Sequence, residues 1–124
     1  MNIINMKATL SMFLLMMLII TGSVTAQESK KITVIIQTSA QCEQCKTRIE
    51  KALAFERGVI SSNLDLETKA VTIEYKKGKT TLDALRKAIA AVGYDADEVK
   101  ADEKAYASLP GCCKKPDDPD HVDH

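Results

Sequence analysis

The segment KITVIIQTSAQCEQCKTRIEKALA, residues 31–54, decides the fold of this chain. Apolar and polar residues alternate over 32–36, and most of the apolar ones are β-branched, which predicts a half-buried strand. After it, apolar residues recur at helical spacing and predict an amphipathic helix. Cys42 and Cys45 lie at the start of that helix. There, free backbone N–H groups and the positive end of the helix dipole favour thiolate over thiol.

The residues that follow predict a turn and a β-hairpin. We expect Phe55 to close the first helix against the core and Gly58 to form the turn after it. Two runs with apolar and polar residues in alternation, 63–66 and 70–75, are separated by the short polar link 67–69. This pattern is typical of two antiparallel strands joined by a tight connection.

A second helix and a last strand complete the expected domain. Apolar residues recur at helical spacing over 82–92, and Thr80 is the expected N-cap of this helix. Residues 94–99 predict a short edge strand. The resulting order β-α-β-β-α-β predicts the α+β class: a ferredoxin-like βαββαβ sandwich whose antiparallel sheet carries two helices on one face.

The start of the chain predicts export. Lys7 is the only charged residue before Glu28, and residues 12–20 form an unbroken apolar run followed by small residues. This run is about half of the ~20 residues that cross a bilayer. Residues 1–26 therefore predict a cleaved signal peptide, and the mature protein is expected to be periplasmic or secreted and not membrane-spanning.

Composition narrows the classes of function. Without residues 1–26 the chain carries 16 basic and 17 acidic residues, so it lacks the basic excess typical of nucleic-acid binding. The remaining length suits one small domain, predicted at 31–100, with an extension at 101–124. There is no Trp and there are few other aromatic residues, which makes a deep apolar substrate pocket a poor expectation.

The residues resemble a known family. The strand, the Cys42-x-x-Cys45 loop, the helix after it, Gly58-Val59, the hairpin and Gly93-Tyr94 together are similar to a heavy-metal-associated (HMA) domain, over roughly residues 31–99. This family includes copper chaperones, domains of copper-exporting ATPases and a periplasmic mercury-binding protein. The resemblance implies that Cys42 and Cys45 bind one soft metal ion in an exposed loop.

The resemblance also implies a cargo and partners. Two thiolates satisfy the low coordination numbers of Cu(I), which is favoured, and of Hg(II), whereas Zn(II) needs two further ligands. Gln41 stands where zinc-preferring members often carry Asp, and Ala40 replaces a Met that usually supports the loop. A metal-transport ATPase or a membrane permease is the implied partner. The function implied is a metallochaperone that passes its metal on by thiolate exchange.

The extension carries further candidate ligands. Cys112 and Cys113 are adjacent, and a disulfide between neighbouring residues is strained, so each is expected to find a more distant partner. They are candidate auxiliary thiolate ligands, or disulfide partners for the loop cysteines. If all four cysteines were ligands, zinc would again be a candidate ion. From Pro110 onward the chain is expected to be a tail, and its polar part, residues 114–124, is expected to be disordered. In this part, His121 and His124 are weak candidates for a borderline divalent ion.

Two other classes of function stay open at this level. A thioredoxin-like thiol-disulfide oxidoreductase shares the strand, the C-x-x-C motif and the helix. Against it, Gln41 replaces the usual aromatic residue, and the prolines (Pro110, Pro116 and Pro119) all lie in the extension. A structural or interaction module with disulfide-bonded cysteines is the third alternative.

Overall fold

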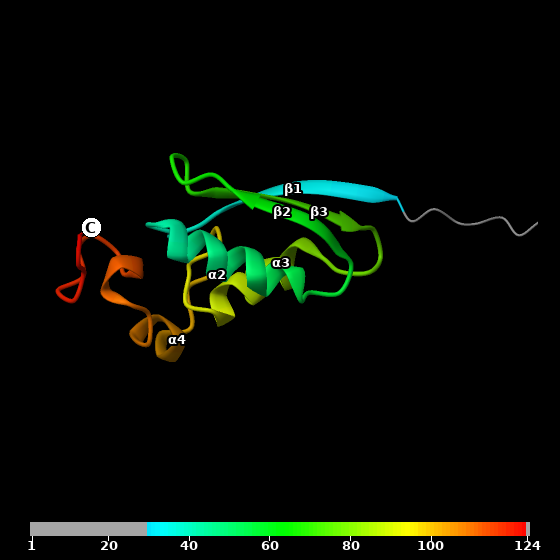
Figure 1. Ribbon diagram of the computed structural model, residues 1–124. Coiled ribbons are helices and arrows are strands. Elements are labelled where there is room, and N and C mark those ends of the chain that lie inside the picture. Colours follow the sequence, from blue (N-terminus) through cyan, green and yellow to red (C-terminus); the bar gives the residue numbers. More distant parts are fainter. Residues whose placement is uncertain (1–29, 124) are drawn as a thin grey trace, which may run out of the picture.

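A three-stranded sheet covered by two helices forms the body of the computed structural model, which describes residues 30–123 (Figure 1). The elements run in the order β1 (Lys31–Gln37), α2 (Glu43–Ala54), β2 (Val59–Leu64), β3 (Ala70–Lys76), α3 (Leu82–Ala91), α4 (Glu103–Ala107) and η2 (Gly111–Cys113). Within this described range, every helix is too short or too polar to cross a bilayer. The predicted signal peptide, 1–26, lies outside the described residues.

The core lies between the sheet and the helices, as the alternating and helical patterns predict. β3 is the central strand and pairs antiparallel with both β1 and β2. Its residues Val71, Ile73 and Tyr75 are buried. They share one hydrophobic cluster with the apolar stripes of α2 and α3, and both helices lie on the same side of the sheet (Figure 1). The arrangement confirms the ferredoxin-like α+β prediction.

The predicted last strand is reduced to isolated bridges, of which one joins it to the end of β1. Ala96 forms an isolated antiparallel bridge with Thr38, just after the end of β1. Asp97 then turns the chain with a φ of 52°, and its carboxylate accepts a hydrogen bond from the Gln37 N–H at 2.9 Å. Because the chain turns back at Asp97, residues 94–99 cannot continue along the edge of β1.

Two local predictions were wrong. The N-cap of α3 is Thr81, one residue after the predicted Thr80, and its side chain accepts from the Ala84 N–H. Phe55 does not close α2 against the core, because its side chain is 81% exposed. Successive helical residues turn by about 100°, so Phe55 lies about 200° around the axis from the buried Leu53 and faces solvent.

The core continues into the extension. Leu109, Cys112 and Cys113 are buried and belong to the same hydrophobic cluster as the sheet and helices. Residues 114–123 differ from the expectation of disorder, because the structure gives them turns. The Tyr106 hydroxyl donates to Asp118 at 2.8 Å, and the Val122 N–H donates to the Gly111 carbonyl at 3.2 Å. These bonds hold the tail against α4 and η2, a contact that its polar composition did not predict.

A charged pair fastens α2 to the edge strand. Lys46 Nζ lies 2.6 Å from Glu50 Oε1 and also donates to the Leu64 carbonyl at 2.8 Å. Glu50 in turn accepts the Leu64 N–H at 3.0 Å. β2 pairs with a neighbouring strand on one side only, so these bonds satisfy backbone groups on its other side.

We predict that Glu50→Ala lowers the free energy of unfolding by about 1–2 kcal/mol, because it leaves the Leu64 N–H without its acceptor and Lys46 without its carboxylate partner. Chemical denaturation measures this change. Lys87→Ala is the matched control, because its pair with Asp83 is well exposed, and it should change stability by less than about 0.5 kcal/mol. Equal effects from the two variants would contradict the role of Glu50.

Candidate metal centre

The cysteine loop is the start of α2. Cys42 is the N-cap residue in extended conformation, but its side chain caps no backbone N–H. Cys45 lies in the first turn and is fully buried, whereas Cys42 is partly exposed. Their sulfurs are 3.5 Å apart. The structure therefore places one accessible and one enclosed thiol side by side at a helix N-terminus.

Hydrogen bonds from the hairpin and from the turn after α3 hold the residues before Cys42. Thr38 donates through its N–H and its hydroxyl to the Lys69 carbonyl, at 3.0 and 2.7 Å. The Ser39 hydroxyl accepts the Asp95 N–H at 2.9 Å. Ala40, which stands where the family usually has Met, is fully buried. The loop is thus fixed on both sides before it reaches the cysteines.

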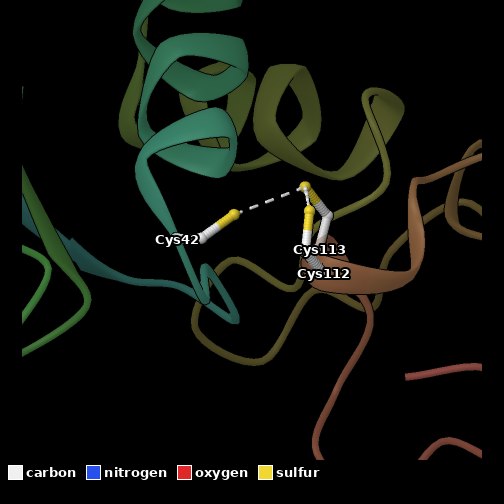
Figure 2. A group of neighbouring side chains, drawn as sticks. All are labelled: Cys42, Cys112 and Cys113. Atoms are coloured by element: carbon white, nitrogen blue, oxygen red, sulfur yellow. Dashed lines mark hydrogen bonds between the residues drawn. The ribbon is translucent and has the colours of Figure 1, made fainter. Parts of the chain in front are cut away.

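The two extension cysteines meet this loop. Cys113 Sγ lies 3.8 Å from Cys42 Sγ and 3.9 Å from Cys112 Sγ. The sulfurs of Cys42, Cys112 and Cys113 all lie within 4.8 Å of one another. Figure 2 shows the Cys42 side chain pointing from α2 towards the pair on η2. All four cysteines are free thiols. The structure thus brings together the four cysteines that the sequence singled out.

The thiols differ in acidity. Partial burial acts to raise the pKa of Cys42, but the N–H groups of Cys45 and Gln44 and the neighbouring thiols outweigh it, so this pKa lies below its usual value. Burial, reinforced by the other cysteines, holds the pKa values of Cys112 and Cys113 above theirs. Of these three thiols, Cys42 is therefore the one best prepared to be a thiolate before any metal binds.

Tyr94 lies beside the cysteines. The structure buries its side chain completely. Burial, and then the nearby Cys45 and Cys113, raise the pKa of its hydroxyl far above the ordinary value. Among the buried side-chain oxygen and nitrogen atoms of residues 30–123, only this hydroxyl oxygen is without a hydrogen-bond partner. It is a neutral O–H donor next to sulfur.

His121 is engaged elsewhere. Its Nδ1 lies 2.9 Å from the Lys114 carbonyl oxygen and its Nε2 lies 2.8 Å from Asp123 Oδ1. Both partners are acceptors, and chiefly Asp123 raises the pKa of this imidazole. A ring that donates from both nitrogens has no lone pair for a metal. His124, the other weak candidate, lies outside the described residues.

Asp95 joins the loop to the extension, a role that sequence reasoning missed. Its N–H reaches Ser39, while its carboxylate accepts the Ala101 N–H at 2.9 Å and pairs with Lys115 Nζ at 2.7 Å. Burial acts to raise the pKa of Asp95, but Lys115 and the Ala101 N–H lower it below its usual value. No sequence motif marks this residue, because its partners lie far along the chain in both directions.

Comparisons with known proteins agree with this geometry. Residues 39–95 match the heavy-metal-associated domain family, and the matched part ends before the extension. The copper chaperone CopZ of Staphylococcus epidermidis is 39% identical over 54 residues, which are 44% of this chain and 79% of that protein. A copper-exporting P-type ATPase of Staphylococcus saprophyticus is 39% identical over 80 residues, 64% of this chain. The chain spans only 10% of the length of that ATPase.

Solved structures show the same fold. A CopZ metallochaperone is 30% identical with a TM-score of 0.51, over 52% of this chain and 98% of that one. Oxidized MerP from Ralstonia metallidurans CH34 is 26% identical with a TM-score of 0.53, over 55% of this chain and 96% of that one. From the matched residues, the 39% identity over most of CopZ and the shared fold, we conclude that this chain belongs to the heavy-metal-associated domain family.

Proposed function

We propose that the protein binds one soft metal cation through Cys42 and Cys45 and passes it to a partner by thiolate exchange. The observation that carries this proposal is the pair of sulfurs 3.5 Å apart at the N-terminus of α2, in a chain of this family. Backbone N–H groups at that end favour the thiolate form that binds metal. The partly exposed Cys42 gives a competing thiolate access to the ion.

Cu(I) is the favoured cargo. Thiolates select soft ions, and Cu(I) accepts two or three of them, whereas Zn(II) takes a tetrahedral shell of four ligands. The relatives described as copper chaperones and copper-exporting ATPases support this choice. Hg(II) is the alternative, because two thiolates also satisfy the low coordination number of this soft ion. Zn(II) fits only if all four cysteines serve as ligands.

The function is binding and transfer rather than catalysis. No bond in a substrate is made or broken when an ion moves from one pair of thiolates to another. The thioredoxin-like alternative shares the strand, the C-x-x-C motif and the helix, but these elements lie here in a different fold, one shared with a metallochaperone. A disulfide-bonded module is the other alternative, and the free thiols of the structure give it no support.

We predict that the reduced protein binds Cu(I) and that Cys42→Ser/Cys45→Ser lowers its affinity by about 1,000-fold or more, because both loop ligands are lost. Anaerobic competition with a chromophoric Cu(I) chelator, together with native mass spectrometry, measures affinity and stoichiometry. Glu43→Gln is the matched control, since it changes the same turn without removing sulfur. Unchanged binding by the double serine variant would refute the loop site, and preferential binding of Hg(II) over Cu(I) would reassign the cargo.

A second experiment tests transfer. The Cu(I)-loaded protein is mixed with the N-terminal domain of a copper-exporting P-type ATPase, and the metal content of both is measured after separation. We expect rapid transfer on direct mixing and almost none across a dialysis membrane, because exchange requires contact between thiolates. The same rate with and without the membrane would show that free ions carry the metal and would contradict ligand exchange.

We further propose that residues 1–26 are a signal peptide and that the protein acts outside the cytoplasm. The charge pattern and the apolar run at 12–20 support this, and a membrane permease or a transport ATPase is the partner we propose there. N-terminal sequencing of protein from the periplasm or medium of expressing cells should begin at Gln27. Recovery of the full-length chain in the cytoplasm alone would contradict export.

A further inference from the structure

Three sulfurs from two distant parts of the chain form a cluster. Cys42 comes from the start of α2, and Cys112 and Cys113 come from η2, about 70 positions later in the sequence. Their side chains point into one space, with Cys112 8% and Cys113 1% exposed (Figure 2). The family match ends at residue 95, so it assigns no role to the extension pair.

The spacing of these sulfurs matches three ligands better than two. With a metal–sulfur bond of about 2.3 Å, as in zinc thiolates, two opposed sulfurs lie about 4.6 Å apart and three at the corners of a triangle lie about 4.0 Å apart. Cys42 and Cys45, at 3.5 Å, must separate by about 1 Å to hold an ion linearly. Cys113 lies 3.8 Å from Cys42 and 3.9 Å from Cys112, close to the triangular spacing.

The extension is anchored at both ends of this cluster. Before it, the Asp102 N–H donates to the Ala90 carbonyl at 2.9 Å, and Leu109 is buried in the core. After it, Lys115 pairs with Asp95 at 2.7 Å. The same Asp95 also holds the loop before Cys42 through Ser39. Two thiols that are fixed on either side lose little further conformational freedom when they bind an ion.

A buried hydroxyl lies beside this cluster. The Tyr94 hydroxyl is fully buried beside Cys45 and Cys113 and lacks an acceptor within the described part of the chain. A buried hydroxyl without a partner costs free energy. Metal binding converts neighbouring thiols into thiolates, which accept hydrogen bonds far better, so an occupied site would satisfy this O–H.

We propose that Cys42, Cys112 and Cys113 form a closed three-thiolate site for one soft monovalent cation. This inference rests on the proposed function and extends it: Cys42 is shared between the closed site and the open pair with Cys45. The closed site stores the ion away from solvent, and the open pair presents it to a partner.

Movement between the two sites needs no oxidant or reductant. As the ion shifts, its bond to Cys45 breaks while bonds to Cys112 and Cys113 form, and the bond to Cys42 persists. Cys112 and Cys113 release two protons to solvent, and the freed Cys45 thiolate takes up one. The ion keeps its charge throughout. Displacement of the extension by a partner reverses these steps.

Single serine variants separate this inference from the proposed function. We expect Cu(I) X-ray absorption to show three sulfur ligands in the full protein and again in Cys45→Ser, but fewer in Cys42→Ser. Cys112→Ser/Cys113→Ser should retain two sulfur ligands and lose roughly 10–100-fold in affinity, the range seen when groups supporting a metal site are removed. A simple Cys42–Cys45 site instead makes Cys45→Ser and Cys42→Ser equally damaging.

Anchor variants test whether the extension acts by being held in place. Lys115→Met breaks the pair with Asp95 and keeps all four thiols, and we expect it to weaken Cu(I) binding by up to about fivefold. Lys104→Met, an exposed lysine of the same extension, is the matched control and should bind as the unaltered protein does. Circular dichroism of each variant establishes that it is folded.

The outcomes are distinct. Two sulfur ligands in the full protein, with the extension pair dispensable, would overturn this inference and leave the Cys42–Cys45 function standing; Cys112 and Cys113 would then be packing residues. Absence of Cu(I) binding by the full reduced protein would overturn the proposed function itself. Equal loss in Cys45→Ser and Cys42→Ser would also overturn the closed site.

Discussion

The whole site depends on a helix that begins without a cap. Ser, Thr, Asp or Asn at the N-cap of α2 would hold its first N–H groups, worth about 1 kcal/mol of stability, whereas Cys42 makes no such bond. The N–H groups of Gln44 and Cys45 instead favour the ionised sulfur of Cys42 and lower its pKa. α2 is therefore slightly less stable than it would be with a capping residue, and the thiolate form of Cys42 is favoured.

Asp95 determines where the rest of the site lies. One residue contacts the loop before the cysteines and the segment after the extension pair, so the two cannot shift independently. The turn that carries it also buries Tyr94 beside the sulfurs. The predicted edge strand is reduced to isolated bridges at Ala96 in this same region. In this region, contacts with the site position the backbone more than pairing with the sheet does.

Local patterns and family resemblance predicted the body of the fold, and long-range contacts account for what they missed. β1, β3, both main helices and the Cys42–Cys45 loop follow from alternation and helical spacing within short windows, whereas β2 begins four residues before the predicted run 63–66. Phe55 was misplaced because periodicity does not show where a helix stops. The tail was predicted to be disordered because its charged side chains were assumed to be solvated. In the structure, Tyr106 donates to Asp118 and Asp95 pairs with Lys115. The meeting of Cys113 with Cys42 depends on packing across 71 positions, which no local signal contains.

The burial of Leu109 has a consequence for where the domain ends. The family match stops at residue 95, yet the hydrophobic cluster runs through Leu109 to Cys113. A chain cut at the family boundary would expose the surface of Tyr94 and Cys45 that the extension covers. The hydrophobic core of this chain therefore extends beyond the residues that match the family, and the sequence of the extension is constrained by packing as well as by the chemistry of its cysteines.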